Sequence, residues 1–372
     1  MFLIAAEYYY YVYLGIVAIM TIYLLNQNTQ KVTVPELVER TMQQPRTVAL
    51  LIVSIFFALF IGLRPISGRF FGDMGVYTAE WFWIIRNAKG WEADNLIFDN
   101  LPRWLNSYGL GYTYFFLINA AIYFIGSAYA MKRIFGGNAL LAYVVWLAAF
   151  STFTYSTNGI KAGAAASLFL VALSFYGRKW WALLFLFLSL SFHHSMRMPV
   201  AVFILCWFVD KPKWYLGFWL LSLAVSASGM TAAMEWLGNI LQSTNDAHGA
   251  SYLLGNVSDG TSGGFRPDFV IYSAVPVVLG YWVIFKRGFN SRFYNFLWSA
   301  YVVINAFWLL CMRANFTNRI AYLSWAFNAL VLVYPFLAKS FMRRQIPMLR
   351  SVVVYNLLFT LFMTIVYYGM LK

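Results

Sequence analysis

The chain has 372 residues, of which 62% are hydrophobic, 20% aromatic and 11% charged, and its formal net charge is +14. A soluble domain carries roughly 45–50% apolar and about 25% charged residues, so this composition excludes a water-soluble fold. Most of the cations lie in short connections between apolar runs, where they indicate membrane topology and anionic lipid rather than nucleic acid. We therefore expect one all-α integral membrane domain over residues 1–372.

Apolar runs of near-membrane length follow one another along the chain. A helix of about 20 residues crosses the roughly 30 Å hydrocarbon core of a bilayer, and on this basis we predict about twelve transmembrane helices. The first run lacks the basic region and the cleavage site of a signal peptide, so we expect it to remain as the first span. The runs are residues 6–25, 48–63, 110–130, 139–153, 159–176, 180–192, 199–209, 214–230, 269–285, 293–310, 320–338 and 352–371.

Lysine and arginine are distributed unequally between alternate connections. Short cytoplasmic loops are enriched in these residues, and one set of short connections carries about sixteen of them. We predict that the opposite set faces away from the cytoplasm, together with both termini. That set consists of residues 64–109, 155–161, 193–197, 231–267 and 312–319, of which 64–109 and 231–267 are long loops.

The connection after the second run contains several ionisable residues. Arg64 and Arg69 flank a glycine-bearing turn, and Asp73, Tyr77 and Glu80 follow at positions i, i+4 and i+7. If this segment is helical, these last three side chains share one face. The segment is then either an interfacial amphipathic helix or part of a site that places carboxylates beside guanidinium groups. The sequence favours neither interpretation.

Two further groups lie where outward connections enter apolar runs. Asn158 and Lys161 open a run of small residues, which permits close helix packing. In SFHHSMR, His193 and His194 are each about one helical turn from Arg197, and a nearby cation favours the neutral imidazole that a general base needs. Adjacent histidines on a helix point about 100° apart, and no HExxH or CxxC pattern accompanies them, so we predict no metal ligation.

Arginines around the second long loop and a late run indicate an anion site. Arg266 lies beside Asp268 in GGFRPDF, and Arg313 and Arg319 bracket a short connection. Guanidinium groups match phosphate oxygens and stay charged when partly desolvated. A single cation at a helix end is usually an interfacial anchor. Several cations on a face that should be depleted of them favour diphosphate binding.

Four motifs in chain order resemble those of one protein family. They are the DxxxY spacing of Asp73 and Tyr77, the turn from Asn158 to Lys161, the sequence FHHS at residues 192–195, and RIAY at residues 319–322. Each motif is short, but the ordered set covers most of the chain. It is similar to the EpsG-like exopolysaccharide and capsule polymerases of the Wzy class. The chain departs from that family at Lys161, where an arginine is more usual.

The resemblance implies a GT-C-like, multi-pass membrane glycosyltransferase of the bacterial inner membrane, with its active face in the periplasm. Such polymerases join oligosaccharide repeats of O-antigen, capsule or exopolysaccharide that are carried on undecaprenyl diphosphate. The implied partners are the lipid-linked donor and acceptor glycans, membrane lipid, a flippase and a chain-length regulator. No cofactor or metal is implied, because arginines can neutralise the leaving diphosphate.

The implied chemistry assigns roles to the residues described above. A general base must take the proton of the acceptor hydroxyl, and the candidates are Asp73, His193 and His194. The residues leave the choice among them open. Cationic and polar side chains would bind the substrate and its diphosphate, and these are Arg64, Tyr77, Asn158, Lys161, Arg197, Arg266, Arg313 and Arg319.

Three other functions are compatible with these residues. A transporter or flippase of lipid-linked saccharide also needs cationic groups, but transporters often show repeated halves, and the sequence has no clear internal repeat. An O-antigen-ligase-type glycosyltransferase uses the same donor chemistry as a polymerase, so the sequence does not separate the two. A membrane O-acyltransferase would need a path for its acyl donor from the cytoplasmic side, where only short basic turns are predicted.

Overall fold

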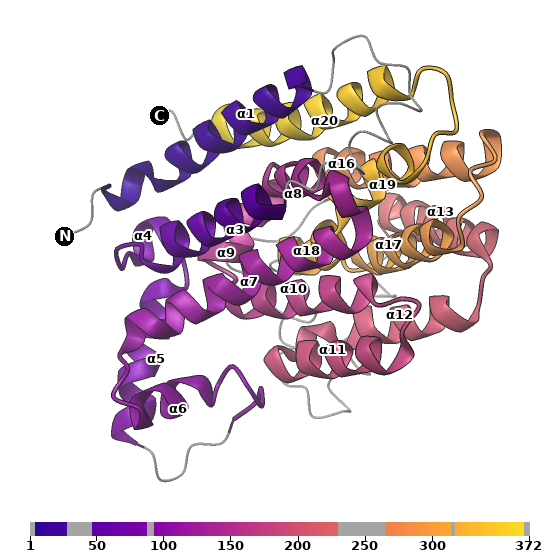
Figure 1. The fold of residues 1–372 in the computed structure, drawn as a ribbon. Coiled ribbons are helices and arrows are strands. Elements are labelled where there is room, and N and C mark those ends of the chain that lie inside the picture. Colours follow the sequence, from indigo (N-terminus) through magenta and orange to yellow (C-terminus); the bar gives the residue numbers. More distant parts are fainter. Residues whose placement is uncertain (1–3, 28–46, 88–92, 230–264, 314–316, 368–372) are drawn as a thin grey trace. The chain divides into compact units, whose positions relative to one another are not determined.

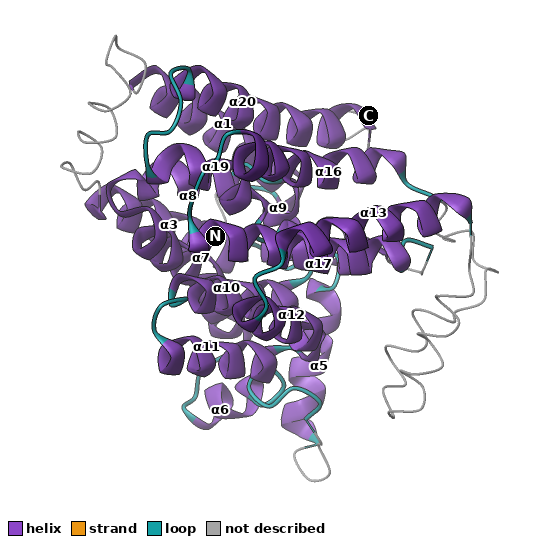
Figure 2. Cartoon of the chain, turned by 90° about the vertical axis from the view of Figure 1, so that its right-hand side faces the viewer, coloured by secondary structure: helices purple, strands orange, loops and turns teal. Residues whose placement is uncertain are grey.

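The computed structural model describes residues 4–27, 47–87, 93–229, 265–313 and 317–367. Within these ranges all regular structure is helical and no strand occurs (Figure 1, Figure 2). The prediction of an all-α fold is therefore confirmed. The chain groups into two compact units, Met1–Val200 with Val333–Lys372, and Ala201–Leu332. The single membrane domain stays a prediction.

The first unit contains both ends of the chain, and its helices α1 and α20 lie side by side (Figure 1). Helices α12 (Arg197–Phe208) and α19 (Asn328–Ala338) each contain a boundary between the units. The other elements of the first unit are η1 (Ala6–Tyr8), α1 (Tyr9–Gln27), α3 (Thr47–Gly62), α4 (Gly68–Phe71), α5 (Met74–Arg86), α6 (Leu101–Ser107), α7 (Tyr112–Phe135), η2 (Gly136–Asn138), α8 (Ala139–Leu147), α9 (Phe150–Thr157), α10 (Ile160–Ser174), α11 (Lys179–Phe192), η3 (His194–Met196), α20 (Gln345–Leu361) and η6 (Phe362–Tyr367).

The second unit is built on the packing of α13 against α17. Between these helices the indole nitrogen of Trp219 donates to Asn305 Oδ1 over 2.8 Å. Asn305 Nδ2 in turn donates over 3.1 Å to Ser324 Oγ on the helix that follows α17. Buried amides need such partners in an apolar interior. The elements of this unit are α13 (Pro212–Ser228), α16 (Pro267–Tyr281), η5 (Trp282–Lys286), α17 (Arg292–Leu310) and α18 (Thr317–Trp325).

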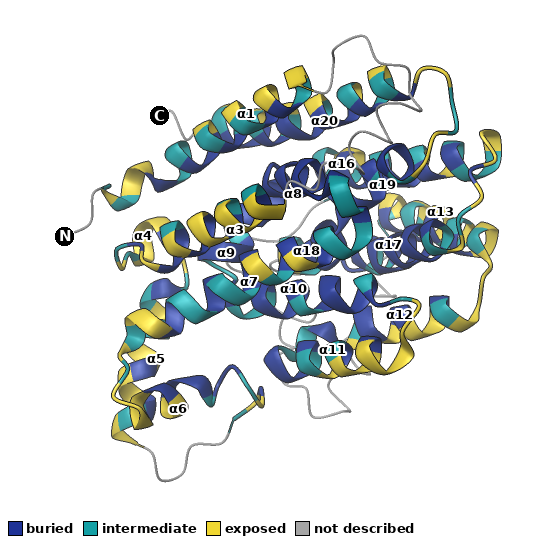
Figure 3. Ribbon diagram, viewed as in Figure 1, coloured by how far each residue is buried: buried dark blue, intermediate teal, exposed yellow. Residues whose placement is uncertain are grey.

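Several helices have the length and composition of membrane spans. Large apolar side chains such as Ile19, Ile52 and Leu221 are more than half exposed, as expected where lipid rather than water is the surrounding medium (Figure 3). In the described ranges six helices are long and apolar enough to cross a membrane, and the count of about twelve stays a prediction. The six are Ala6–Gln27, Tyr112–Leu147, Pro267–Lys286, Arg292–Leu310, Thr317–Ala338 and Gln345–Tyr367.

The predicted run 139–153 is wrong as one continuous helix. It is divided into α8 and α9, because Ala149 is extended with a ψ of 141°. The nine residues of α8 are all buried (Figure 3). At 1.5 Å per residue they are too short to cross the roughly 30 Å core by themselves, and they form the last part of the candidate span Tyr112–Leu147.

Side chains from distant helices satisfy the carbonyl groups at this break. The carbonyl of Leu147 accepts a hydrogen bond from the Tyr13 hydroxyl over 2.7 Å. Those of Val145 and Ala148 accept bonds of 2.9 Å from Asn356 Nδ2 and 2.8 Å from Thr360 Oγ1 on α20. A helix end in an apolar interior requires such partners, because no water is available there.

The two long predicted loops have different outcomes. The connection 64–109 contains α4, α5 and α6, so it is largely helical rather than a loop. Most of the second, 231–267, lies outside the described residues.

Candidate functional site

The turn between α9 and α10 receives contacts from the segment that follows α3. Arg64 binds the carbonyl of Thr157, the main chain of Asp73 binds the side chain of Asn158, and Lys161 binds a further carboxylate of that segment. The partners are separated by 93, 85 and 62 positions in the sequence. The structure thus gathers four predicted site residues of the first unit around one turn.

Arg64 is buried, with only 3% of its surface exposed. Its Nη1 donates to the carbonyl of Ile61 over 2.7 Å, and its Nη2 donates to that of Thr157 over 2.8 Å. The guanidinium also lies over the rings of Phe71 and Phe116, 5.1 and 5.5 Å from their centroids. These contacts tie the end of α3 to the end of α9, and they use the groups with which Arg64 was predicted to bind a diphosphate.

Gly72 allows the chain to approach Asn158. Its φ of 54° lies in the left-handed region that favours glycine, and a Cβ placed there would collide with the Asn158 side chain. The next residue, Asp73, donates its main-chain N–H to Asn158 Oδ1 over 2.8 Å and precedes α5 as its N-cap. The helical spacing predicted for Asp73, Tyr77 and Glu80 is confirmed.

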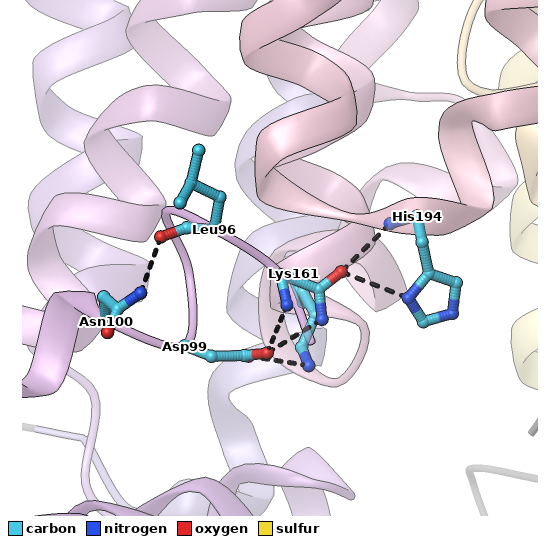
Figure 4. A network of polar contacts seen from close by, with 6 residues as sticks. Leu96, Asp99, Asn100, Lys161 and His194 are labelled. Carbon is cyan, nitrogen blue, oxygen red and sulfur yellow. Dashed lines mark hydrogen bonds and ion pairs between the residues drawn. The ribbon is translucent and has the colours of Figure 1, made fainter. Parts of the chain in front are cut away.

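A polar network leads from Lys161 to His194 (Figure 4). Lys161 Nζ lies 3.0 Å from Asp99 Oδ1. The other carboxylate oxygen, Asp99 Oδ2, accepts from the main-chain nitrogen and Nδ2 of Asn95 over 2.7 and 2.9 Å. Asn95 Oδ1 lies 3.0 Å from the main-chain nitrogen and 3.2 Å from Nδ1 of His194. Asn95 and Asp99 are both buried, so the imidazole is joined to the ion pair by an enclosed amide.

A small cavity lies beside this network. Rings and carboxyl groups of α5 and the following segment line it, including Tyr77, Glu80, Phe98 and Asp99. Burial raises the pKa of Glu80, the ammonium of Lys161 lowers it, and the carboxylates of Asp99 and Asp73 raise it again. The raised pKa means that neutral Glu80 persists to a higher pH than a carboxyl in water would.

The two histidines differ in backbone structure. His193 is extended, with φ of −156° and ψ of 126°, and it separates α11 from η3. The helical spacing predicted for His193 and Arg197 is therefore wrong, because no continuous helix joins them. His194 begins η3, and Arg197 is exposed at the start of α12.

The second unit contains the other predicted arginines. Arg266 forms a two-point ion pair with Asp268, in which Nε and Nη2 donate over 3.0 and 2.6 Å. This pairing reduces the positive charge that Arg266 offers to another anion. Among the described residues, the buried Nε of Arg313 has no hydrogen-bond partner, and Arg319 is exposed on α18.

Asn95 and Asp99 were not among the predicted site residues. They lie in the segment DNLIFDN. Asparagine and aspartate are common in the surface segments of any protein, so their presence there did not indicate a site. The signal that could have identified them is their spacing of four residues, which lets an Asp side chain accept from the Asn main chain and amide. In the described ranges no three His, Cys, Asp or Glu side chains form a metal-binding group, and the absence of a metal stays a prediction.

Replacing Lys161 with alanine should destabilise the protein by about 2 kcal/mol, because it leaves a carboxylate in a mostly enclosed position without its cation. The Lys161 and Asp99 side chains are 21% and 9% exposed, so we expect less than the roughly 3–5 kcal/mol of a fully buried pair. Lys161→Arg keeps the charge and should cost about 0.5 kcal/mol or less. Reversible unfolding in mixed detergent micelles measures both, and equal losses in the two variants would contradict an electrostatic role.

Comparison with known protein families identifies a family for this chain. The chain matches the EpsG family over residues 47–372, from the first residue of α3 to the C-terminus. The match includes every predicted site residue. No curated protein and no solved structure matches the chain. Because the family match covers well over half of the sequence, it confirms the resemblance drawn from the motifs, and the chain belongs to the EpsG family.

Proposed function

We propose that this protein is a polysaccharide polymerase that joins oligosaccharide repeats carried on undecaprenyl diphosphate. The EpsG family match supports a polymerase-type membrane protein, and the long apolar helices support a membrane location. The structural observation that carries the proposal is the enclosed network of Lys161, Asp99, Asn95 and His194. It joins the imidazole of His194, through the buried amide of Asn95, to the ion pair of Lys161 and Asp99.

In the proposed reaction, a sugar hydroxyl of the acceptor attacks the anomeric carbon of the donor. A glycosidic C–O bond forms, the C–O bond to the diphosphate breaks, and undecaprenyl diphosphate leaves with the bonding electron pair. The hydroxyl proton passes to a general base, for which we assign His194 rather than Asp73, because imidazole accepts a proton near neutral pH more readily than a carboxylate does.

Charge on the leaving diphosphate needs cations. We assign this role to Arg313 and Arg319 on the chemistry of the guanidinium group, which binds phosphate oxygens at two points. For the same role Arg266 would have to exchange its two-point pairing with Asp268 for the diphosphate. Arg197 is a further candidate, because it is exposed at the start of α12. No metal or cofactor is part of this proposal.

The lysine and arginine distribution supports the proposed location. We place the network at the periplasmic face of the bacterial inner membrane, with both termini on that side. The partners in this proposal are the lipid-linked donor and acceptor glycans and the surrounding lipid. A flippase that delivers these glycans and a chain-length regulator that limits the product are further proposed partners, which follow from the family resemblance alone.

The test is chain extension by the purified protein in nanodiscs, supplied with its lipid-linked oligosaccharide and chelator and without nucleotide sugar. We expect a ladder of longer lipid-linked glycans. Arg319→Ala should lower the extension rate by about 100-fold or more, as expected for loss of a group that stabilises developing charge. Lys179→Ala, a change at the opposite end of α11 from the network, is the matched control and should leave the ladder intact.

Two results would contradict the proposal. The first is an absent ladder together with movement of the lipid-linked glycan across a sealed bilayer, which is the outcome for a transporter. The second is transfer of a single glycan to a non-glycan acceptor without any ladder, which is the outcome for a ligase.

A further inference from the structure

Two contacts fix the orientation of the Asn95 amide. The main-chain N–H of His194 donates to Asn95 Oδ1 over 3.0 Å, so an oxygen must lie at that position. At the other end Asn95 Nδ2 donates over 2.9 Å to Asp99 Oδ2, and an ionised carboxylate only accepts hydrogen bonds. Both ends therefore require the same orientation of the amide. An alternative with nitrogen and oxygen exchanged would lose both bonds.

The fixed amide decides which nitrogen of His194 carries a proton. His194 Nδ1 lies 3.2 Å from Asn95 Oδ1. Because a carbonyl oxygen accepts but never donates, this contact is a hydrogen bond only when Nδ1 is protonated. In a neutral imidazole the lone pair then belongs to the other nitrogen, Nε2.

We propose that Asn95 and Asp99 are positioning residues that hold His194 in its Nδ1-protonated tautomer, so that Nε2 is the atom that takes the proton of the acceptor hydroxyl. This inference rests on the proposed function, because it names the atom at which the proposed base acts. After the transfer His194 is an imidazolium, and its Nδ1–H bond to Asn95 is unchanged. No proton moves along the network.

Each member of the network orients the next. Lys161 Nζ occupies Asp99 Oδ1 at 3.0 Å, which leaves Oδ2 to the two nitrogens of Asn95. Asn95 is only 2% exposed and Asp99 only 8%, so water does not compete freely for these bonds. Lys161 thereby acts through Asp99 rather than on the substrate. Removing the hydrogen-bond partner that orients a metal-ligating histidine costs about 10- to 100-fold in metal affinity or activity, and we expect a similar factor for an oriented general base.

The first test measures the tautomer directly and needs no activity. The chain has three histidines, so ¹⁵N-histidine labelling of the full-length protein in nanodiscs gives few imidazole signals. Loss of signals in His194→Gln identifies those of His194. We expect a protonated Nδ1 and an unprotonated Nε2 at a pH where the ring is neutral. A His194 ring protonated at Nε2 in the wild-type protein would overturn the inference, whatever the polymerase activity.

The second test compares variants. Asn95→Ala removes the acceptor, so the Nε2-protonated tautomer should become populated and kcat for chain extension should fall about 10- to 100-fold with KM little changed. Asp99→Asn should weaken the same control and give a smaller fall. Matched controls lie on the same segment: Asn100, whose Nδ2 donates to the carbonyl of Leu96 (Figure 4), and the exposed Asp94. Asn100→Ala and Asp94→Asn should change neither the tautomer nor kcat.

The outcomes separate this inference from the proposed function. Both are supported if the wild-type protein makes the ladder and has the expected tautomer, and if the tautomer shifts in Asn95→Ala. If the wild-type protein makes the ladder but folded Asn95→Ala and Asp99→Asn show no tautomer shift, the inference is overturned and the proposed function stands. An absent ladder with the expected tautomer and shift contradicts the proposed polymerase while the positioning of His194 by Asn95 stands.

Discussion

Replacing His194 with alanine should reduce the rate of glycan chain extension by about 10²- to 10⁴-fold, the range expected for the loss of a general base. The physical reason is that the acceptor hydroxyl keeps its proton during attack on the anomeric carbon. The measurement is single-turnover extension at saturating lipid-linked donor, which separates the chemical step from binding. His194→Gln should show the same loss, because glutamine fills similar space without accepting a proton at neutral pH.

The His194 variants also decide between the candidate bases. Asn100→Ala is the matched control, because Asn100 lies on the segment that carries Asn95 and Asp99, and its side-chain amide donates to the nearby carbonyl of Leu96. If Asp73→Asn abolishes extension while His194→Ala keeps most of it, Asp73 is the base and our assignment is wrong. Asp73→Asn keeps the main-chain N–H of residue 73, which donates to Asn158 Oδ1 over 2.8 Å, so this contact stays in place.

Replacing Gly72 with alanine should destabilise the protein by roughly 2–4 kcal/mol. Part of this cost, about 1 kcal/mol, comes from placing a Cβ at a φ of 54°. The remainder comes from collision with Asn158, which must move and so lose its bond of 2.8 Å from the Asp73 main chain. Reversible unfolding in mixed micelles measures the free energy, and extension activity should fall with it because α5 begins at this point.

Two further variants separate the two costs. Gly109 also has a positive φ, of 72°, but a Cβ there would meet nothing within 4 Å. Gly109→Ala should therefore cost only about 1 kcal/mol. Adding Asn158→Ala to Gly72→Ala removes the colliding side chain, so the double variant should be less destabilised than the sum of the single variants. Equal costs for Gly72→Ala and Gly109→Ala would show that the approach to Asn158 does not constrain the chain.

The fold class and part of the site could be predicted from the sequence because their signals are local. Apolar runs identify helices in a membrane without any knowledge of their partners. Polar residues such as Asn158, Lys161 and His194 stand out because they lie close to the ends of apolar runs. The structure brings Asp73 to Asn158, and it joins Lys161 to His194 through other residues.

Other features depend on partners that are distant in the sequence. The break between α8 and α9 falls in an apolar stretch with no proline or glycine, and nothing nearby indicates that its carbonyls bind side chains of α20. Asn95 and Asp99 lie in a polar segment, where one more polar residue carries little information. The extended backbone of His193 likewise depends on how α11 and η3 meet, not on its own residue type.

The break between α8 and α9 also constrains the order in which the chain can complete its fold during synthesis. The carbonyls of Val145 and Ala148 receive their hydrogen bonds from residues 211 and 212 positions later. A ribosome makes about 5–20 residues per second, so these groups must wait roughly 10–40 s for their partners. Until then they need water or another protein as a substitute, because lipid offers no donor. Helix α20 therefore supplies the hydrogen-bond donors for the break between α8 and α9. Folding of the first unit is complete only after α20 has been synthesised and has packed there.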